Sequence, residues 1–359
     1  MVRAVISPST GPHPAFRAFV VIVGALAAVF GIGCEADREP IVLSGPAQGT
    51  SYRVTITEPP AELDADRARA AMRDVIDVVD RRMSTWRDDS ELSRFNAGPA
   101  NEWVSVSPQL AGLVRHALRI GRETEGAFDV TIAPVLQIWG FGAGADRPER
   151  LPSRDELDAA REDTGIGLVD VRMEPPALRK KRAGTRLDLA GLAQGYTVDR
   201  MAERLDELGA KRYLVELGGE LFARGRKSED DAWRIGVEKP QAGVRAVERV
   251  VELADAGMTT SGDYRDFFEI DGRRFSHTID PRTGRPVAHD LRAVTVIAEE
   301  AITADAMATA LLVMGPDNGL RYADAHDIAA LFVSGGNEAG YTESNSQAFE
   351  PYLQDKESQ

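Results

Sequence analysis

The order of the elements that the sequence predicts is what most constrains its fold. Short segments with strand alternation outnumber the helical segments, and several follow one another closely enough to pair as hairpins. The helical pattern is confined to a few pieces, which we expect near 61–83, 108–124, 153–163, 191–208 and 302–314. Strict strand–helix alternation would favour a parallel sheet. The observed order predicts instead an α+β fold with mostly antiparallel sheets and a few long helices.

Composition and charge exclude several classes of protein. The chain has 359 residues, 43% of them hydrophobic, which is enough for one large domain or two smaller ones. Its formal net charge is -14, so no nucleic-acid partner is expected, because neutralising phosphates needs clustered Lys and Arg. Cys34 is the one cysteine, which excludes an intramolecular disulfide and a multi-thiolate zinc site. Any metal ion would be a hard cation held by oxygen atoms.

Residues 1–33 have the features of an export signal. Two arginines and no acidic residue precede Cys34, and residues 18–33 form an unbroken run of apolar and small residues. That run is shorter than the ~20 residues of a membrane span and fits the apolar region of a signal peptide. It ends directly before Cys34, which resembles a bacterial lipoprotein signal in which this cysteine becomes the lipidated first residue, although Gly31 stands where leucine is typical. A plain secretory signal and an uncleaved anchor are the alternatives, and all three place the domain outside the cytoplasm.

The remainder of the chain divides into three parts on composition. We expect a polar tether at 34–48, one domain at 49–338 and a polar C-terminal tail at 339–359 that is loosely held. Within the domain, residues 259–264 are small and polar and indicate a loop.

The stretch 187–200 is typical of a strand end, a glycine turn and a helix start. Asp188 lies in a short predicted strand at 185–189, and Gly191 and Gly195 let the backbone approach another group closely. A carboxylate at a strand end, beside a glycine-lined helix N-terminus, suits a phosphate or a metal. The alternative is an ordinary strand–turn–helix joint whose glycines only allow close packing.

Two further acidic residues are candidates for chemistry. Asp305 and Thr309 are four residues apart in a predicted helix, so they share one face and both can ligate a hard cation. Asp280 begins a proline-containing turn shortly after His277. Asp305 can alternatively complement the helix dipole, and Asp280 can cap its turn.

The candidate residues belong to a longer series of short segments that covers nearly all of 49–335. The segments are 49–50, 84–86, 89–96, 127–131, 139–142, 188–199, 217–219, 260–264, 276–284, 304–305 and 308–309. Taken in order, they resemble the FAD:protein FMN transferase family (ApbE-like). Their order and spacing make the set far more specific than any single motif.

The resemblance implies a duplicated α+β fold related to the T-fold, with FAD as substrate and Mg²⁺ as cofactor. Such enzymes split the pyrophosphate of FAD, join FMN to a threonine hydroxyl of an acceptor protein and release AMP. The acceptors are exported or membrane subunits of electron-transfer complexes. It therefore predicts a transferase anchored by lipid to a bacterial membrane, on the periplasmic side. An FAD pyrophosphatase giving FMN and AMP and a non-catalytic FAD-binding lipoprotein are the alternatives.

The resemblance also implies roles for individual residues. The implied metal ligands are Asp305, Thr309 and the carbonyl at Gly191, with the carbonyl at Ala308 as a further candidate. His277 is the candidate base for the acceptor hydroxyl, and Asp280 is its rival or a second-metal ligand. The positions implied to contact FAD are Gln48, Trp86, Ala127, Phe128, Asp129, Asp188, Gln194 and Ile279.

Three of these positions depart from the family pattern. Gln48 stands where methionine is common, Gln194 where lysine is frequent, and Ala308 where some members carry an additional acid. Trp86, an isolated aromatic residue in a polar segment, can stack on a ring ligand or can simply cover the edge of the core.

Overall fold

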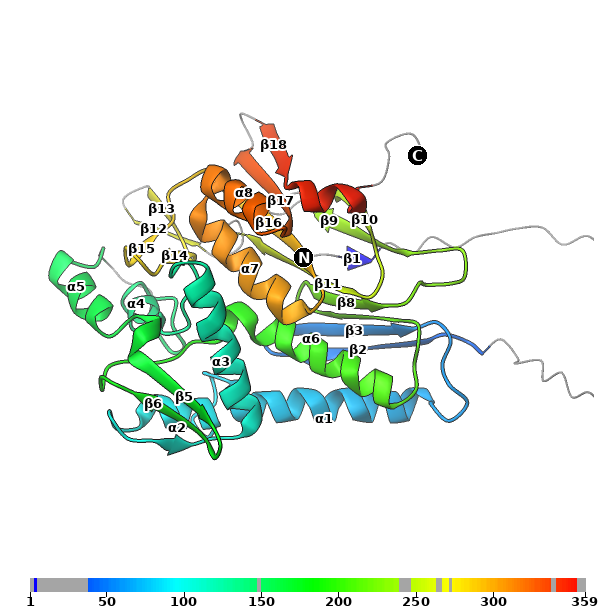
Figure 1. The fold of residues 1–359 in the computed structure, drawn as a ribbon, viewed down its shortest axis with the longest axis horizontal. Coiled ribbons are helices and arrows are strands. Elements are labelled where there is room, and N and C mark those ends of the chain that lie inside the picture. The colour runs from blue at the N-terminus through cyan, green and yellow to red at the C-terminus, as the bar shows by residue number, and fades with distance from the viewer. Residues whose placement is uncertain are drawn as a thin grey trace, which may run out of the picture.

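An antiparallel sheet of eight strands forms the centre of the computed structural model, which describes residues 3–4, 38–146, 150–238, 247–262, 267–270, 273–336 and 340–353. The strand order is β18-β17-β16-β11-β8-β7-β3-β2, and every neighbouring pair is antiparallel (Figure 1). The strands are β2 (Ile41–Ala47), β3 (Thr50–Ile56), β7 (Tyr213–Leu217), β8 (Glu220–Arg224), β11 (Ala256–Gly262), β16 (Leu291–Ala298), β17 (Ala329–Gly336) and β18 (Gly340–Asn345).

The sheet is built from two halves with the same topology. The first half runs β2, β3, α1, α6, β7, β8, and the second runs β11, β16, α7, α8, β17, β18. In each half, strands that follow one another in the chain are neighbours in the sheet, and two of these four helices come between the second and the third strand. The predicted α+β class and its duplication are therefore confirmed. The helices are α1 (Ala65–Met83), α6 (Ala190–Glu207), α7 (Ala301–Met314) and α8 (Pro316–Ala325).

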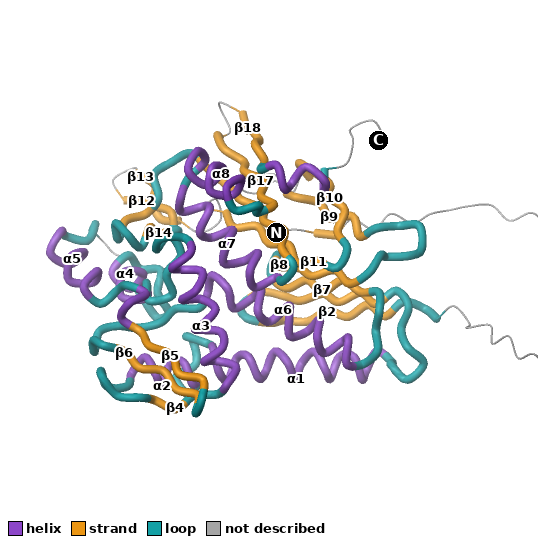
Figure 2. The backbone as a smooth tube through the Cα atoms, viewed as in Figure 1, coloured by secondary structure: helices purple, strands orange, loops and turns teal. Residues whose placement is uncertain are grey.

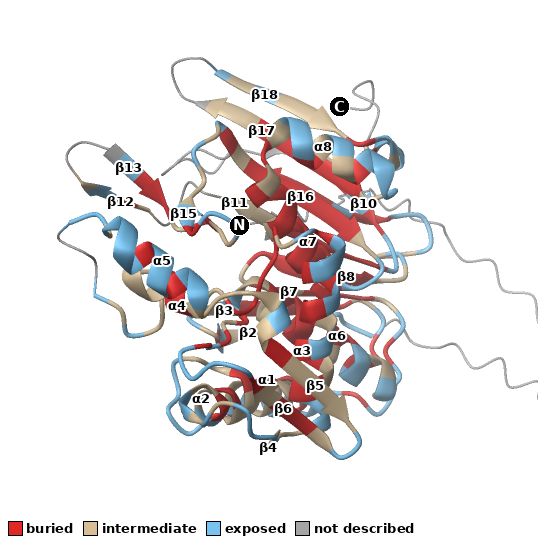
Figure 3. Ribbon diagram, turned by 60° about the vertical axis from the view of Figure 1, so that its left-hand side comes forward, coloured by how far each residue is buried: buried red, intermediate tan, exposed pale blue. Residues whose placement is uncertain are grey.

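The four helices pack side by side in the order α1, α6, α7, α8, and α6 and α7 lie against the sheet (Figures 1 and 2). The helix α7 is apolar on all sides and is among the most buried elements of the molecule (Figure 3). Because its surface is almost entirely apolar, α7 packs at the junction of the sheet, α6 and the insertion that follows α1. Asp305 is the one acidic side chain within this helix and is 5% exposed.

Three insertions extend this frame. The first lies between α1 and α6, and the second, between β11 and β16, contains the hairpins β12–β13 and β14–β15. The third, β9 and β10, joins the two halves, and Arg3–Ala4 (β1) pairs with β9. The last element of the described residues is η2 (Gln347–Tyr352). The remaining bounds are α2 (Glu91–Ala97), β4 (Val104–Ser105), α3 (Pro108–Glu123), α4 (Ala133–Ile138), α5 (Arg154–Glu162), η1 (Ile166–Leu168), β5 (Val169–Met173), β6 (Pro176–Lys180), β9 (Trp233–Glu238), β10 (Val247–Leu253), β12 (Phe267–Ile270), β13 (Arg273–Ser276), β14 (Ile279–Asp280) and β15 (Arg285–Pro286).

Aromatic side chains join the first two insertions at one end of the molecule. The ring of Trp139 lies 5.8 Å from that of Phe275, and the ring of Phe141 lies 5.2 Å from that of Phe268. The indole nitrogen of Trp139 also donates to the carbonyl of Gly284 at 2.8 Å. These contacts hold together the two insertions, which supply Phe141 and Ile279 to the wall of the cavity described below.

Local sequence explains the main element boundaries. The expected capping box of α5 is present, with Ser153 accepting from the Glu156 backbone and Glu156 accepting from the Ser153 backbone. The β2–β3 hairpin turns through Gln48 and Gly49, whose φ angles of 47° and 76° match a two-residue type I′ turn.

The structure corrects four expectations. Segment 185–189 is not a strand, because it makes only one isolated bridge, between Arg186 and Ile132. The expected loop at 259–264 begins inside β11, and its last two residues lie outside the described residues. The expected tether at 34–48 is too long, because residues 41–47 form β2. The expected tail at 339–359 is not loosely held throughout, because it contains β18 and η2.

Both corrected ends are edge strands, held by ladder hydrogen bonds to a single neighbour. β18 (Gly340–Asn345) has no buried side chain that would reveal it in the sequence, whereas β2 buries Ile41, Leu43 and Ala47 on one face, so its alternation was an available signal. Phe349 is fully buried in a core cluster and anchors η2. Cys34 and most of the predicted signal lie outside the described residues. Within the ranges that the structure describes, none of the helices combines the length and apolar content that a bilayer span requires.

Candidate active site

A cavity of 490 Å³ opens where the first turns of α6, the middle of α7, β8 and β11 face the two joined insertions. Its size is that of a small-molecule site, which typically encloses ~300–1,000 Å³. Most of the residues predicted from the sequence line it. They are Ala127, Phe128, Asp129, Asp188, Gly191, Gln194, His277, Ile279, Asp305 and Thr309.

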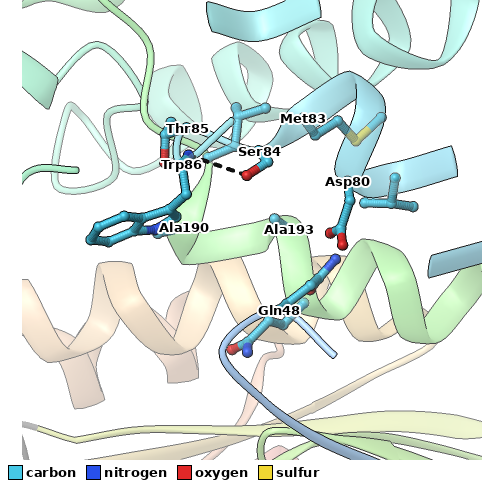
Figure 4. Close-up of a pocket in the computed structure, with 11 residues that line it drawn as sticks. Gln48, Asp80, Met83, Ser84, Thr85, Trp86, Ala190 and Ala193 are labelled. Atoms are coloured by element: carbon cyan, nitrogen blue, oxygen red, sulfur yellow. Dashed lines mark hydrogen bonds between the residues drawn. The ribbon is translucent and has the colours of Figure 1, made fainter. Parts of the chain in front are cut away.

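A second hollow of 230 Å³ adjoins the first, and the two share Ala190 and Gln194 in their walls. Gln48 and Trp86 both line this second hollow, and Ala193 of α6 lies between them (Figure 4). Trp86 is 78% exposed, so it does not cover the edge of the core. An exposed aromatic ring at the mouth of a pocket is suited to stacking on a planar ligand.

The side chain of Gln48 is fixed in the wall of this hollow. Its amide nitrogen donates to the hydroxyl of Thr197 at 2.8 Å, and its hydrogen bond to Asp80 partly offsets the effect of burial, which raises the pKa of Asp80. The turn residue therefore links the β2–β3 hairpin to α1 and α6 at the edge of the site.

Glycines bring α6 and α7 into contact beneath the cavity. A Cβ atom on Gly195 would lie 2.5 Å from the carbonyl oxygen of Ala301 and 2.8 Å from the Cβ of Asp305, and one on Gly191 would lie 3.5 Å from the Thr309 hydroxyl. Only glycine at 195 permits this approach. The crossing places the Asp305 carboxylate and the Thr309 hydroxyl directly beside the first turns of α6.

Hydrogen bonds then fix the two side chains. The backbone N–H of Gly195 donates to Asp305 Oδ2 at 3.0 Å, and the hydroxyls of Thr309 and Ser261 lie 3.2 Å apart. At the start of α7, Asp199 accepts hydrogen bonds from the backbone N–H groups of Ala301 and Ile302 at 2.8 and 2.9 Å, which ties the N-terminus of α7 to α6.

The floor of the cavity is strongly acidic. Asp305 and Glu220 are 5% and 8% exposed and both line it. Burial raises the pKa of Asp305, and the charge of Asp199 acts in the same direction. Burial also raises the pKa of Glu220 well above its usual value, and the charge of Asp305 adds to the increase. Two buried carboxylates so close together are destabilising unless a cation compensates them.

The oxygen donors at this floor fit a small hard cation. Asp305 offers a carboxylate, Thr309 a hydroxyl and Gly191 a backbone carbonyl on the adjoining helix. Among the described residues no cluster of three or more His, Cys, Asp or Glu side chains could hold a metal by itself. This sparse donor set matches Mg²⁺, which is usually bound through one or two carboxylates and completes its shell with water and substrate phosphates.

The N-terminus of α6 faces the same cavity. Asp188 Oδ1 accepts a hydrogen bond from the backbone N–H of Ala190 at 2.8 Å, which partly offsets the effect of burial, and burial raises the pKa of Asp188. The unpaired N–H groups and dipole of a helix N-terminus attract anions. The oxygen donors that fit a cation and a helix end suited to an anion therefore line the same cavity.

Asp129 forms the opposite wall. Its Oδ1 accepts hydrogen bonds from the backbone and the hydroxyl of Thr131 at 2.7 and 2.6 Å. These bonds partly offset burial, which raises the pKa of Asp129. Phe128 packs against α6, where a Cβ on Gly191 would lie 3.2 Å from its ring. The loop that carries both residues is thus held rigidly over the cavity.

The structure separates the two candidates for the catalytic base. His277 lies in the cavity wall, with its ring 6.3 Å from that of Phe141 in an edge-on arrangement. Asp280 is not in the wall, and both of its carboxylate oxygens accept hydrogen bonds from Arg282, at 2.9 to 3.1 Å. Ala308 is fully buried in the core and is not part of the cavity wall either.

Sequence reasoning missed Glu220, Ser261 and Asp199. Glu220 directly follows Gly218-Gly219 at the start of β8, and an acid after a glycine pair was the available signal. Ser261 was assigned to a loop, although it is a strand residue bonded to Thr309. Asp199 lies on α6 after the glycine turn. Its hydrogen bonds to the start of α7 join residues far apart in the chain, so no local sequence pattern predicts them.

A model of the ApbE family matches residues 48–332, which is most of the chain. The chain belongs to the ApbE family. The FAD:protein FMN transferase of Vibrio cholerae serotype O1 is 40% identical over 321 residues, covering 89% of this chain and 95% of that protein. The FAD:protein FMN transferase of Escherichia coli K12 is 36% identical over 318 residues, covering 86% and 90%.

Solved structures of ApbE proteins share the fold. The flavin transferase ApbE from Vibrio cholerae matches with a TM-score of 0.80 at 38% identity, covering 88% of this chain and 99% of that one. The apo form of the flavinyl transferase ApbE from Pseudomonas stutzeri matches with a TM-score of 0.80 at 37% identity, covering 88% and 96%. The cavity of this ApbE protein therefore belongs to a fold shared with flavin transferases.

Proposed function

We propose that this ApbE protein transfers FMN from FAD to a threonine hydroxyl of an acceptor protein and releases AMP, with Mg²⁺ as cofactor. The observation that carries the proposal is the junction of α6 and α7. There the oxygens of Asp305, Thr309 and Gly191 adjoin a helix N-terminus, in a chain related over most of its length to FAD:protein FMN transferases. Binding a pyrophosphate needs a cation that neutralises its negative charge and N–H donors that bind its oxygen atoms.

The protein groups divide the work between the two hollows. Trp86, at the exposed mouth of the smaller hollow, offers a stacking surface for a ring of FAD. The N-terminus of α6 orients the phosphates at the boundary between the hollows. A bound Mg²⁺ would neutralise charge on the non-bridging phosphate oxygens, and Asp305, Thr309 and the Gly191 carbonyl would hold it. Binding FAD across both hollows would leave the phosphorus accessible to an incoming hydroxyl.

His277 is the group that we propose to activate the acceptor. Its imidazole takes the proton of the threonine hydroxyl as the oxygen attacks phosphorus, a transfer for which a histidine is suited near neutral pH. The new bond joins the threonine oxygen to the FMN phosphorus, and the bond to the AMP oxygen breaks. Asp280 is better placed to hold Arg282 than to act as a base.

The N-terminal sequence supports a location outside the cytoplasm. We propose that residues 1–33 are removed, that Cys34 carries a lipid, and that the domain lies on the periplasmic side of a bacterial membrane. The acceptors would then be exported or membrane subunits of electron-transfer complexes, reached without crossing a bilayer.

A gel assay tests the transfer directly. The full-length protein is incubated with FAD, Mg²⁺ and an acceptor domain with a candidate threonine, and in-gel flavin fluorescence is measured after denaturation. The proposal predicts a fluorescent acceptor band that disappears with EDTA and with Asp305→Asn. Free FMN and AMP without a band would identify an FAD pyrophosphatase. Intact FAD with every acceptor tested would identify a non-catalytic FAD-binding protein. Either outcome would overturn the proposal.

A further inference from the structure

Glu220 is a buried acid that the proposed reaction has not yet used. It is the first residue of β8, its side chain is 8% exposed, and it lines the cavity together with Asp305. Its Oε2 atom is buried and has no hydrogen-bond partner among the described residues. Leaving a buried carboxylate oxygen unpaired costs several kcal/mol, so such a group persists where a ligand compensates it.

The backbone around Glu220 is shaped to admit this side chain. Gly218 and Gly219 precede it with φ angles of 72° and 131°, which are left-handed conformations that favour glycine. A Cβ on Gly218 would lie 3.0 Å from Glu220 Oε2 and 2.8 Å from the side-chain nitrogen of Gln194. The glycine therefore leaves room for the carboxylate beside the first turns of α6.

The electrostatic surroundings of Glu220 leave its charge uncompensated. The described residues that line the cavity include neither Lys nor Arg. Gln194, its neighbour across Gly218, is uncharged, and Asp305 and Glu216 are acidic groups whose charges act on it. A divalent cation at the cavity floor is the group that would satisfy both carboxylates at once.

We propose that Glu220 is a second acidic ligand of the divalent cation held at the α6–α7 junction, in addition to Asp305, Thr309 and the Gly191 carbonyl. This inference rests on the metal dependence in the proposed function. With two carboxylates the protein itself neutralises the charge of a divalent ion, so the cation binds before FAD arrives. With Asp305 alone, the cation would depend on the substrate phosphates for the rest of its charge compensation.

Mn²⁺, a spectroscopic substitute for Mg²⁺, tests the inference without FAD. Its dissociation constant is measured by titration calorimetry and by the electron paramagnetic resonance of free Mn²⁺, using the purified full-length protein and Glu220→Gln. We expect binding to weaken by about tenfold or more in the variant, because removing a single supporting group at a metal site already costs ~10–100-fold. The matched control is Glu216→Gln, whose side chain also acts electrostatically on Glu220 but does not line the cavity.

Thermal unfolding provides a readout that a structural role would not produce. We expect Glu220→Gln to leave Tm unchanged or raise it in the absence of metal, because the buried Oε2 of Glu220 has no hydrogen bond to lose within the described part of the chain. The same variant should lose most of the Tm increase that Mn²⁺ gives to the wild type. A Tm that falls without metal, together with unchanged Mn²⁺ affinity, would show that Glu220 supports the fold and would overturn the inference.

The outcomes separate this inference from the proposed function. If the wild type binds no Mn²⁺, the metal dependence of the proposed function fails. If the wild type and Glu220→Gln bind Mn²⁺ equally, or Glu216→Gln weakens binding as much, only the role of Glu220 fails. Should Glu220→Gln not fold, crystals of the wild type soaked in Mn²⁺ decide the question. Anomalous density within about 2.5 Å of a Glu220 oxygen supports direct ligation, and density beyond that distance contradicts it.

Discussion

Replacing Gly195 with alanine should both destabilise the protein and disturb the proposed cation site. The new Cβ would lie 2.5 Å from the carbonyl oxygen of Ala301 and 2.8 Å from the Cβ of Asp305, whereas ordinary contact begins at 3.4 Å. Relief of that overlap requires α6 and α7 to separate by about 1 Å at their crossing, because the closest neighbour is backbone and cannot rotate away.

The size of the effect follows from two opposed contributions. Alanine is intrinsically favoured over glycine in a helix by about 1 kcal/mol. Overpacking a tightly packed contact costs about 1–3 kcal/mol, and more where backbone must move. Because backbone must move here, we take the upper end of that cost, about 3 kcal/mol, and subtract about 1 kcal/mol for the helix preference, so Gly195→Ala should lower the free energy of unfolding by roughly 2 kcal/mol. Moving Asp305 and Thr309 away from Gly191 should also weaken Mn²⁺ binding, since Mg²⁺-type sites tolerate little change in ligand distance.

Gly112→Ala is the matched control. Gly112 is also inside a helix, α3, but a Cβ there would meet nothing within 4 Å. This variant should gain about 0.5–1 kcal/mol and bind Mn²⁺ as the wild type does. Urea denaturation followed by circular dichroism gives both unfolding free energies. A Gly195→Ala protein that is as stable as Gly112→Ala, with normal Mn²⁺ affinity, would refute the packing argument.

Three further predictions concern single side chains. Trp86→Ala should raise the KM for FAD by about tenfold, because a stacking contact is worth ~1–3 kcal/mol. Tm should not change, because Trp86 is 78% exposed. An unchanged KM would place the flavin elsewhere. His277→Ala should lower kcat by ~10²-fold or more at neutral pH, while Asp280→Asn should have a much smaller effect, and equal losses would contradict the assignment of the base. Burial raises the pKa of Asp199 to about 7, so its protonated form is favoured in the folded state and the wild type should lose stability as pH rises from about 4 to 7. Asp199→Asn should remove at most about 4 kcal/mol of that pH dependence in urea titrations without metal, and an identical pH profile in the two proteins would show that Asp199 stays charged.

The elements that the sequence predicted well are those with strong internal periodicity. The helices found at Ala65–Met83, Pro108–Glu123 and Ala190–Glu207 lie within a few residues of their expected bounds, because each buries one continuous apolar face. The edge strand β18 lacks such a signal. Gly340–Asn345 alternates only weakly in burial and owes its conformation to hydrogen bonds with Ala329–Gly336, which are long-range and leave no local pattern.

The candidate site was predictable only in part, for the same reason. Asp305 and Thr309 could be paired from their four-residue spacing, since both lie on one helix. The proximity of Glu220 to Asp305 depends on how β8, α6 and α7 meet, and no local sequence pattern encodes that meeting. The sequence left Asp280 as a rival to His277, and the structure distinguishes them by the place of His277 in the cavity wall and by the contacts of Arg282 with the Asp280 carboxylate.

The most direct test of the account is the ratio of AMP released to flavin bound covalently to the acceptor. AMP is measured by chromatography, and the flavin is located by mass spectrometry of the acceptor and of its Thr→Val variant. If the α6–α7 cavity transfers FMN, each AMP should be matched by one FMN on the threonine, and both should vanish in Asp305→Asn. AMP released with unmodified threonine, or flavin attached when Asp305 is replaced, would contradict the account.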